Sequence, residues 1–433
     1  MKIAVVGSGI SGLSAAWQLS RDGHEVALYE AGSYFGGHTN TVDVEIDGER
    51  FGVDTGFLVF NHRTYPNLVR LFEQLQVHTS ASDMSFAVKM PIDATVGART
   101  LEWAGSNLDT VFAQRRNLLS PRFWRMLRDI LRFNRQTTEL ALAAGAMDEI
   151  PLGDFLNAHR YSEEFRDWYL LPMAGCIWSC PTEQMLAFPL ATFVRFCHNH
   201  GLIQVNNRPQ WHTVTGGARH YVNKMLERIE QRYLNTAVTA VRRIPLGASH
   251  QVWVESARGV QLYDHVVLAT HNDQALRLLH DISDAERDVL SAVAYQPNQA
   301  ILHTDVSCLP QSRKAWSAWN YESTGPGESR VCVHYLLNKL QPLPVDTPVI
   351  VSLNPVHAPE PSKVLARFEY AHPVFDAPAI NAQRKLVALQ GARNTWFAGA
   401  WTGYGFHEDG LKSGLAVAAS IAAHALPPAK QAA

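Results

Sequence analysis

The first thirty residues contain two short apolar runs separated by a segment with helical periodicity. Residues 2–6 (KIAVV) form an uninterrupted apolar run, which is typical of a buried parallel strand. In the next segment Leu13, Ala16 and Leu19 recur at helical intervals, and residues 25–29 (EVALY) read as a second strand. This order predicts a β–α–β unit at the start of an α/β fold.

A glycine-rich turn joins the first predicted strand to the predicted helix. The sequence GSGISG places Gly7, Gly9 and Gly12 in the GxGxxG spacing, and Glu30 directly follows the second strand. Glycines in this spacing let the backbone approach a diphosphate at the helix N-terminus, while the acid accepts hydrogen bonds from ribose hydroxyls. Because strand, turn, helix and acid are in register, the segment predicts a dinucleotide site rather than an ordinary glycine turn.

Two further segments could approach the same dinucleotide. Gly36-Gly37 follows the ribose acid closely, which suits a second loop against an extended cofactor, although an ordinary turn would look the same. Near the end of the chain, residues 395–399 (TWFAG) read as a strand, and a helix of small residues is expected to begin near Leu411. The start of that helix could aim backbone N–H groups at a flavin ring. A capped, alanine-rich core helix would explain the same residues.

Taken together, these segments resemble the flavin-containing amine oxidase superfamily, which includes protoporphyrinogen oxidases and carotenoid desaturases. The matching segments run from the start to the end of the chain: GSGISGLSAAWQL, Glu30 with Gly36-Gly37, VDTGF, TVTGGARHYV, NTAVTAV, DHVVLAT and WFAGAWTGYGFHEDGLKSG. The last of these and AYQPNQAILHTD are similar to a bacterial branch associated with modified fatty acids.

The resemblance implies an α/β fold in which a Rossmann-type FAD-binding domain is interleaved with a helix-rich α+β substrate domain. It assigns residues 1–80, 205–285 and 390–425 to the FAD domain. Residues 81–204 and 286–389 would form the substrate domain, and residues 426–433 a flexible tail.

The resemblance also implies a set of cofactor-binding residues. Val238 would present its backbone to the adenine side, and Glu408 to Leu411 would meet the flavin ring. No cysteine lies near the C-terminal segment, so FAD is expected to bind non-covalently. The full set is Gly7, Gly9, Ile10, Ser11, Gly12, Glu30, Gly36, Gly37, His38, Thr39, Thr55, Gly56, Phe57, Val238, Gly399, Ala400, Glu408, Asp409, Gly410 and Leu411.

The sequence departs from the pattern of the superfamily in three respects. His38 stands where an arginine commonly meets the diphosphate, and it would be a shorter, only partly charged donor. Ala400 replaces an acid that often follows the C-terminal strand. Residues 291–304 contain no lysine, whereas amine oxidases usually hold a water at the flavin with one. The missing lysine favours dehydrogenation or desaturation of carbon–carbon bonds over amine oxidation.

His407 is the first candidate for a catalytic residue, because amine oxidases place an aromatic side chain over the flavin at the matching position. Its imidazole could also move protons near neutral pH. Trp401, Tyr404 and Phe406 would form walls of the substrate site. Core packing would explain each of these residues equally simply.

Other aromatic and histidine residues give weaker signals. Six aromatic side chains could line an apolar cavity or pack in the core: Trp178, Phe188, Phe193, Trp211, Trp316 and Trp319. His198, His200 and His212 could suggest a metal, but no carboxylate stands near them, so no metal site is predicted.

Composition narrows the class of protein further. The 38 Lys+Arg against 40 Asp+Glu argue against a nucleic-acid binder. The five cysteines are an odd and sparse set, which fits a reducing compartment, and Cys176 and Cys180 read as helix packing. Nothing at the start resembles a signal peptide, so a cytoplasmic protein is expected.

Residues 115–136 (RRNLLSPRFWRMLRDILRFNRQ) have the pattern of a basic amphipathic helix. Arg125, Arg128, Arg132 and Arg135 share one face, whereas the apolar residues Phe123, Leu127, Ile130 and Leu131 occupy another. Such a helix could lie on an anionic membrane, at the inner membrane surface, or pack its apolar face on the core.

These observations predict an FAD-dependent oxidoreductase that abstracts a hydride from an apolar substrate, such as a modified fatty acyl chain. The class of electron acceptor stays open. A flavin amine oxidase acting on a small amine is the enzymatic alternative, and a non-redox flavoenzyme such as a mutase or isomerase is another. A flavin-less lipid- or prenyl-binding chaperone of the same fold is the non-enzymatic alternative.

Overall fold

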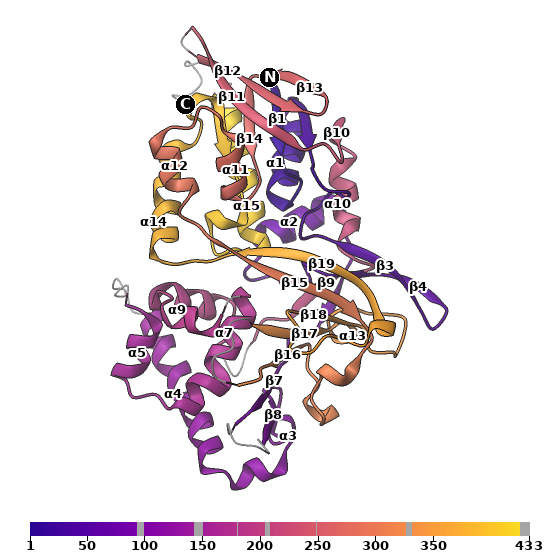
Figure 1. Ribbon diagram of the computed structural model, residues 1–433, viewed down its shortest axis with the longest axis vertical. Coiled ribbons are helices and arrows are strands. Elements are labelled where there is room, and N and C mark those ends of the chain that lie inside the picture. Colours follow the sequence, from indigo (N-terminus) through magenta and orange to yellow (C-terminus); the bar gives the residue numbers. More distant parts are fainter. Residues whose placement is uncertain are drawn as a thin grey trace.

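The computed structural model of the 433-residue chain describes residues 1–92, 99–142, 150–179, 181–203, 208–247, 249–325 and 331–424. Helices and strands form two parts, each built around a sheet (Figure 1). The predicted α/β class with an α+β second part is confirmed. The predicted tail, residues 426–433, lies outside the described residues.

The first sheet is parallel and brings together both ends and the middle of the chain. Its strand order is β10 (Gln231–Tyr233), β2 (Glu25–Tyr29), β1 (Lys2–Val6), β14 (His265–Leu268) and β20 (Thr395–Phe397). Ile3 and Val5 of β1 pack in one core and Ala4 and Val6 in another, because successive side chains point to opposite faces. Burial on both faces explains the uninterrupted apolar run at the start of the chain.

Two helices on this sheet pack unusually close together. These are α1 (Ile10–Arg21) and α15 (His407–His424). A Cβ on Gly414 would lie 2.1 Å from the carbonyl oxygen of Ser11, so only glycine fits there. The helix predicted to begin near Leu411 starts at His407, because the Asp409 carboxylate accepts the Phe406 N–H at 3.0 Å and closes an additional turn.

The second sheet is mixed and contains seven strands. Its order is β19 (Val364–Pro373), β15 (Tyr295–His303), β18 (Ile350–Leu353), β17 (Cys332–Leu336), β16 (Trp319–Glu322), β7 (Phe86–Pro91) and β8 (Thr100–Ala104). Only β16 and β7 pair in parallel; the other neighbouring strands of this sheet are antiparallel in the described residues. The long strands β15 and β19 run between the two parts of the molecule (Figure 1).

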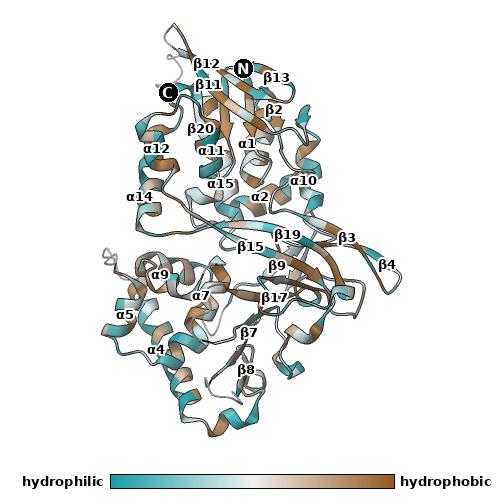
Figure 2. Cartoon of the chain, in the orientation of Figure 1, coloured by the Kyte–Doolittle hydropathy of each residue, from teal (hydrophilic) through white to brown (hydrophobic). Residues whose placement is uncertain are grey.

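A group of helices packs at one end of this second sheet (Figure 1). Their ribbons alternate between apolar and polar residues (Figure 2), and many of their apolar residues pack in a hydrophobic core. The members are α4 (Pro121–Leu142), α5 (Leu152–Ala158), α6 (Glu163–Phe165), η2 (Arg166–Leu170), α7 (Leu171–Trp178), α8 (Thr182–Leu186) and α9 (Leu190–Asn199).

Smaller sheets and helices complete the fold. The strands are β3 (Thr41–Ile46), β4 (Glu49–Asp54), β5 (Phe60–Asn61), β6 (Thr79–Ser82), β9 (Trp211–Val214), β11 (Val238–Leu246), β12 (Ser249–Ser256) and β13 (Gly259–Tyr263). The helices are α2 (Pro66–Leu75), α3 (Leu108–Val111), α10 (Arg219–Leu226), α11 (Asn272–Leu278), α12 (Asp284–Leu290), α13 (Leu337–Leu340) and α14 (Ala377–Leu386). Short helical turns are η1 (Arg115–Leu119), η3 (Val306–Cys308), η4 (Arg313–Ala315), η5 (Pro361–Lys363), η6 (Val387–Leu389), η7 (Ala392–Asn394) and η8 (Ala400–Thr402).

The predicted basic amphipathic helix corresponds to η1 and α4. Arg122 and Arg125 form ion pairs with the buried carboxylate of Glu164, and Phe123 is buried. Leu131, by contrast, is 60% exposed and does not join the buried face. Part of the apolar pattern therefore packs on the core. Among the described residues, no helix has both the length and the apolar character needed to cross a membrane.

Candidate functional site

A cavity of about 650 Å³ opens at the carboxyl ends of the parallel strands. The turn Gly7–Ser11 follows β1, Glu30 follows β2, Ala269–His271 follows β14, and Gly399–Trp401 follows β20. Parallel strands end at the same edge of a sheet, so segments from the start, middle and end of the chain line one cavity. The volume lies in the range of small-molecule and cofactor sites.

The glycine-rich turn is shaped by close backbone approaches. Gly7 has a φ of +97°, and a Cβ on Gly12 would lie 1.9 Å from the carbonyl oxygen of Gly7. Gly37 reaches the same turn from the next loop, where its Cβ would lie 3.0 Å from the Cα of Gly9. A Cβ on Gly9 itself would meet no protein atom within 4 Å. The turn is tightly packed on its inner side and open towards the cavity.

Glu30 is held at the end of β2 by the neighbouring backbone. Its carboxylate accepts the N–H of Ser8 at 3.0 Å, the hydroxyl of Ser8 at 2.5 Å and the N–H of Gly32 at 2.7 Å. These bonds fix the carboxylate at the cavity wall, where it can accept hydrogen bonds from ribose hydroxyls.

The cavity fits a dinucleotide in three independent respects. The first turn of α1 carries no acidic residue, so the positive end of the helix dipole is free to meet an anion. The open space beside Gly9 permits close approach of a ligand to the backbone. The Nε2 atom of His38 is buried without a hydrogen-bond partner in the described part of the protein, as expected for a polar atom whose partner is a ligand.

His38 is not the partly charged donor that the sequence suggested. Its ring stacks on Tyr370 at 4.8 Å and lies 5.2 Å from the ring of His372. Burial lowers the pKa of His38 to about 3, and nearby histidines add to the effect. The imidazole is therefore neutral at physiological pH, because burial disfavours its charged form.

His407 lines the cavity and is held on two sides. Its ring stacks on Phe57 with centroids 3.8 Å apart, and its Nε2 atom lies 2.7 Å from the hydroxyl of Tyr221. That hydroxyl also contacts the hydroxyl of Thr39 at 2.6 Å. Burial lowers the pKa of His407 to about 3, which favours a neutral imidazole at neutral pH, and proton transfer by His407 stays a prediction.

Most of the residues predicted from the sequence line this cavity. The members that line it are Gly7, Gly9, Ile10, Ser11, Glu30, Gly36, Gly37, His38, Thr55, Gly56, Phe57, Val238, Gly399, Ala400, Trp401 and His407. The members that do not line it are Gly12, Thr39, Tyr404, Glu408, Asp409, Gly410 and Leu411.

The residues outside the cavity have structural partners that explain their positions. The Glu408 carboxylate accepts the N–H groups of Asn67 and Leu68 at 2.9 and 3.0 Å and so caps α2. Tyr404 packs on Phe196 with ring centroids 6.0 Å apart. Leu411 is fully buried between helices. The start of α15 meets the cavity through Phe406 and His407 rather than through Glu408 to Leu411.

The remaining wall of the cavity is apolar and aromatic. Trp211 and Trp319 line it, whereas the other four aromatic candidates, Trp178, Phe188, Phe193 and Trp316, pack elsewhere in the protein. His200 also lines it, and burial lowers its pKa to about 4. Further lining residues are Leu58, Val59, Tyr65, Met84, Cys176, Ile177, Phe196, Leu202, Tyr335, Val351 and Leu353.

Sequence reasoning missed a cluster formed by strands β15 and β19 and by the turn between β14 and α11. His271, Tyr295, Tyr370 and His372 all line the cavity. A signal was present: Ala366, Phe368, Tyr370 and His372 alternate with Arg367 and Glu369, which is the period of a half-buried strand. Without the pairing of β15 with β19, nothing connected that strand to the nucleotide motif.

The charge of the cavity is low. Within the described part of the chain, Glu30 and Arg277 are the lining residues with a permanent charge, and no lysine lines the cavity. Arg277 forms an ion pair with Asp273 at 2.8 Å on the exposed face of α11. A substrate in this cavity would therefore meet neutral groups and apolar surface.

Histidines with lowered pKa values predict that acid destabilises the FAD-free protein. A histidine in the unfolded chain has a pKa near ~6.5. Between pH 6.5 and 4 the unfolded chain therefore binds more protons than the folded chain does. Stability therefore falls as pH drops, by about 1.4 kcal/mol per pH unit for each fully shifted histidine. The pKa is lowered to about 3 for His38 and His407 and to about 4 for His200, His303 and His372.

Two buried carboxyl groups and His334, whose pKa is raised well above its usual range, oppose this trend without cancelling it. Burial raises the pKa of Asp54 and Asp409 to about 6, so below that pH the folded chain gains protons and stability from them. Urea denaturation at pH 7 and pH 5 is expected to show a net loss on the order of several kcal/mol at the lower pH. A midpoint that stays constant or rises on acidification would contradict the burial of these imidazoles in neutral form.

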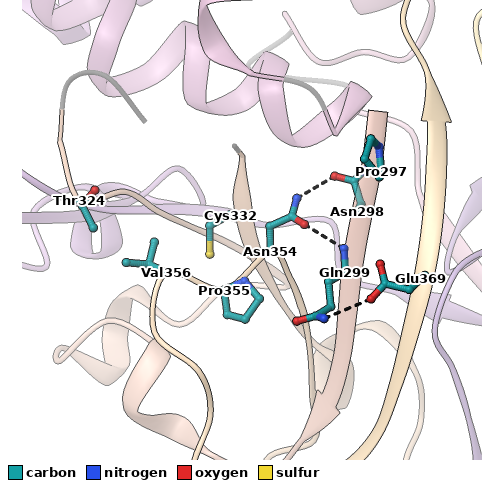
Figure 3. Close-up of a pocket in the computed structure, with 9 residues that line it drawn as sticks. All are labelled: Pro297, Asn298, Gln299, Thr324, Cys332, Asn354, Pro355, Val356 and Glu369. Carbon is teal, nitrogen blue, oxygen red and sulfur yellow. Dashed lines mark hydrogen bonds between the residues drawn. The ribbon is translucent and has the colours of Figure 1, made fainter. Parts of the chain in front are cut away.

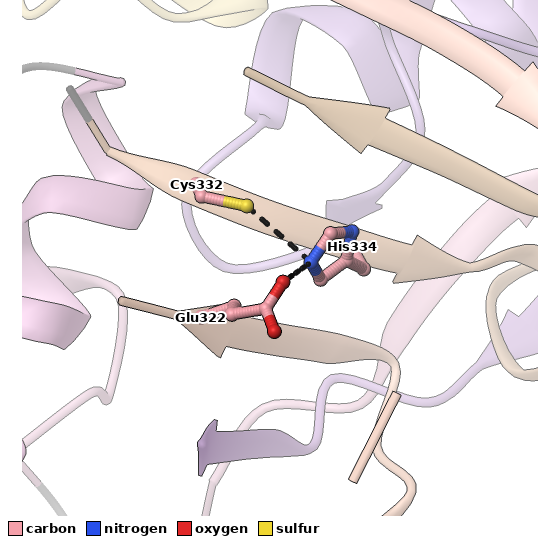
Figure 4. A group of neighbouring side chains, drawn as sticks. All are labelled: Glu322, Cys332 and His334. Carbon is pink, nitrogen blue, oxygen red and sulfur yellow. Dashed lines mark hydrogen bonds and ion pairs between the residues drawn. The ribbon is translucent and has the colours of Figure 1, made fainter. Parts of the chain in front are cut away.

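A separate group of side chains lies inside the second sheet. Among the described residues, Glu322, Cys332 and His334 are spaced as metal ligands could be, within 4.8 Å of one another (Figure 4). The Nε2 atom of His334 lies 3.0 Å from Glu322 and 3.3 Å from the Cys332 sulfur. Lys89 forms an ion pair with the other oxygen of Glu322 at 2.8 Å. Because the lysine supplies the counter-charge, we interpret the group as a buried ion-pair network.

Comparison with known proteins gives a family for the chain. The family model described as "Flavin containing amine oxidoreductase" matches residues 10–422. A zeta-carotene desaturase of Synechocystis sp. is 39% identical over 75 residues, which are 17% of this chain and 14% of that protein. A putative flavin-containing monoamine oxidase of Mycobacterium tuberculosis is 25% identical over 259 residues, 56% of this chain and 51% of that protein. The matched parts span about half or less of these relatives.

Solved structures of low sequence identity share the fold. Putrescine oxidase, in a structure with putrescine bound, has a TM-score of 0.69 and 16% identity, and the match covers 98% of this chain and 99% of that one. A fatty acid isomerase from P. acnes that produces CLA has a TM-score of 0.65 and 14% identity, with 98% of both chains covered.

Proposed function

Because this chain belongs to the flavin-containing amine oxidoreductase family, we propose that it is an FAD-dependent oxidoreductase that removes hydrogen from a C–H bond of an apolar substrate. A modified fatty acyl chain is the substrate class we favour. The observation that carries this proposal is the neutral, apolar wall of the cavity, in which no described lysine takes part. The relatives include a carotene desaturase, which supports chemistry on hydrocarbon chains.

One group of residues would bind FAD, and another group would bind and orient the substrate. The turn Gly7–Ser11 and Glu30 would hold the nucleotide part of non-covalently bound FAD, at the N-terminus of α1. When bound, FAD supplies the acceptor for the hydride that leaves one substrate carbon, and the proton lost from the neighbouring carbon passes to solvent. Apolar side chains such as Ile177 and Leu353 would exclude water and hold the substrate by burial of its surface.

His407 and Phe57 would act as a rigid wall rather than as an acid–base pair. Their stacked rings, 3.8 Å apart, are anchored by the contact of His407 with the Tyr221 hydroxyl. An imidazole with a pKa near 3 is a poor base at neutral pH. Orientation of the substrate against the flavin, rather than proton transfer by His407, is the role that fits this geometry.

The proposal is tested by product analysis. The purified protein with FAD, supplied with an artificial electron acceptor and with phospholipids that carry modified acyl chains, should yield a product two hydrogen atoms lighter by mass spectrometry. Formation of hydrogen peroxide and aldehyde from small amines, with lipids unchanged, would replace the proposal with amine oxidation. A lipid product of unchanged mass would indicate isomerisation, for which the fold shared with the fatty acid isomerase is a precedent. Failure to bind FAD would favour a lipid-binding chaperone.

We also propose that the protein works in the cytoplasm and contacts the inner membrane surface through an apolar tip formed by Leu108, Leu118, Leu119 and Trp124. Leu119 is 88% exposed and Leu108 77% exposed. Helix α3, which begins at Leu108, lies at the end of the molecule away from the parallel sheet (Figure 1). The indole N–H of Trp124 donates to the carbonyl of Leu118 at 2.9 Å, which joins α4 to η1. Apolar side chains beside basic ones suit an anionic lipid surface.

A flotation assay tests the membrane contact. The protein should float with vesicles of phosphatidylcholine and phosphatidylglycerol at low salt, and less with phosphatidylcholine alone, because Arg115, Arg116, Arg125 and Arg128 lie near the tip in the sequence. A Leu119→Asp, Trp124→Asp variant should lose flotation and keep its FAD. Equal flotation of variant and wild type would show that the tip is not the contact surface.

A further inference from the structure

His372 lies on β19, at the wall of the cavity described above. It lies two residues after Tyr370 along the strand, and both residues line the cavity. β19 pairs with β15 in antiparallel fashion, which sets Gln296 opposite His372 and Asn298 opposite Tyr370. His372 does not belong to the GxGxxG motif or to the segments that resemble the family. It also does not contact the stacked rings of Phe57 and His407 in the described contacts.

A chain of amide groups behind His372 determines which of its ring nitrogens carries a proton. The chain begins at the backbone N–H of Gln299, which can only donate and does so to Oδ1 of Asn354 at 2.9 Å (Figure 3). The amide nitrogen of Asn354 must then donate, to the carbonyl of Val331 at 3.1 Å and to Oδ1 of Asn298 at 2.7 Å. Figure 3 shows both bonds of Asn354 that involve the drawn residues.

The orientation of Asn298 follows from that of Asn354. With its oxygen occupied as an acceptor, Asn298 turns its amide nitrogen towards the carbonyl of Gln296 at 2.9 Å and towards Nδ1 of His372 at 2.9 Å. A backbone N–H at one end and a backbone carbonyl at the other fix both amide orientations. Nδ1 of His372 can therefore only accept.

A neutral imidazole that accepts at Nδ1 carries its proton at Nε2. Burial lowers the pKa of His372 to about 4, which agrees with a neutral ring. The Nε2 atom has no hydrogen-bond partner among the described residues, and the side chain lines the cavity. His372 thus presents a donor of fixed direction to a ligand, and Asn298 is the residue that positions it.

The surroundings of His372 indicate which part of a ligand receives this bond. Its ring lies 5.2 Å from the ring of His38, which directly follows Gly37. Gly37 in turn packs against Gly9, at the start of α1, where an anion is favoured. We infer that His372 donates its Nε2–H to the diphosphate of FAD, in the role that a neutral donor can fill where no arginine is present. This inference rests on the FAD binding of the proposed function.

Nuclear magnetic resonance of the full-length chain with ¹⁵N-labelled histidine tests the tautomer directly. The signals lost in a His372→Gln variant belong to His372, and they should show a protonated Nε2 and an unprotonated Nδ1 at neutral pH. A protonated Nδ1 would overturn the inference, because the Asn298 amide could not then donate to it. This readout needs neither substrate nor turnover.

Binding of ADP and FAD to the full-length protein, after removal of its flavin, tests the diphosphate assignment. A His372→Phe variant should bind both ligands about tenfold to a hundredfold more weakly, because a hydrogen bond to a charged group is lost. A His372→Gln variant, whose amide nitrogen can reach the position of Nε2, should stay within about threefold of wild type for both ligands. Thermal unfolding of the FAD-free variants checks that both are folded.

The outcomes separate this inference from the proposed function. Weaker binding of FAD with unchanged binding of ADP would place the donor away from the diphosphate and overturn the assignment. Equal losses in the Phe and Gln variants, or no loss in either, would also overturn it. A wild-type protein that binds no FAD would instead contradict the proposed function itself.

Discussion

A Gly9→Ala variant is expected to fold with almost unchanged stability and to lose most of its affinity for FAD. A Cβ at Gly9 would meet no protein atom within 4 Å, and the backbone φ of −61° is compatible with alanine. The added methyl group would occupy space that the diphosphate needs beside the N-terminus of α1. Overpacking of this kind costs about 1–3 kcal/mol, roughly tenfold to a hundredfold in the dissociation constant.

Gly12→Ala is the matched comparison for this prediction. A Cβ there would lie 1.9 Å from the carbonyl oxygen of Gly7, so the turn itself must move. This variant should lose both thermal stability and FAD binding. Fluorescence titration with FAD and thermal denaturation of the FAD-free proteins separate the two effects. A Gly9→Ala protein that binds FAD as tightly as wild type would contradict the placement of the diphosphate at this turn.

An Ile177→Glu variant is expected to lose activity on an apolar substrate by at least about a hundredfold in kcat/KM, because substrate binding would bury a carboxylate without a partner. Ile177 lies on α7, lines the cavity and is partly exposed within it, so the protein can hydrate the new side chain when no substrate is bound. FAD binding should be unchanged, because Ile177 belongs to the helical part rather than to the nucleotide turn.

The same variant distinguishes between substrate classes. A cationic amine would gain a counter-charge from the introduced carboxylate, and its kcat/KM would stay constant or rise. An Ile177→Met variant of similar volume, without charge, should behave as wild type towards either substrate. The values of kcat/KM of both variants with a lipid and with an amine therefore show which class of substrate binds in the cavity.

The sequence was most informative where the chemistry depends on local backbone. Gly7, Gly9 and Glu30 could be placed correctly because a GxGxxG turn, its helix and the acid after the next strand form one contiguous β–α–β unit. The stretch around Trp401 and His407 was also found to line the cavity. Its role could be anticipated only through resemblance, since a capped core helix has the same pattern.

Features that depend on tertiary contacts could not be derived in the same way. The neutral state of His38 and His407 follows from burial, which residue type does not reveal. Glu408 caps α2, a helix more than three hundred residues earlier in the chain. His372 enters the site through the pairing of β19 with β15, whose register is set by the whole sheet. The division into domains at the stated residues stays a prediction.

Anaerobic reduction of the bound flavin is the measurement that tests the central claim most directly. The purified protein is expected to show the flavin absorption bands near ~370 and ~450 nm that belong to the cofactor itself. Addition of phospholipids with modified acyl chains, without oxygen, should bleach the band at the longer wavelength, whereas small amines should leave it unchanged. Bleaching by amines but not by lipids would contradict the account of the cavity as a site for apolar substrates.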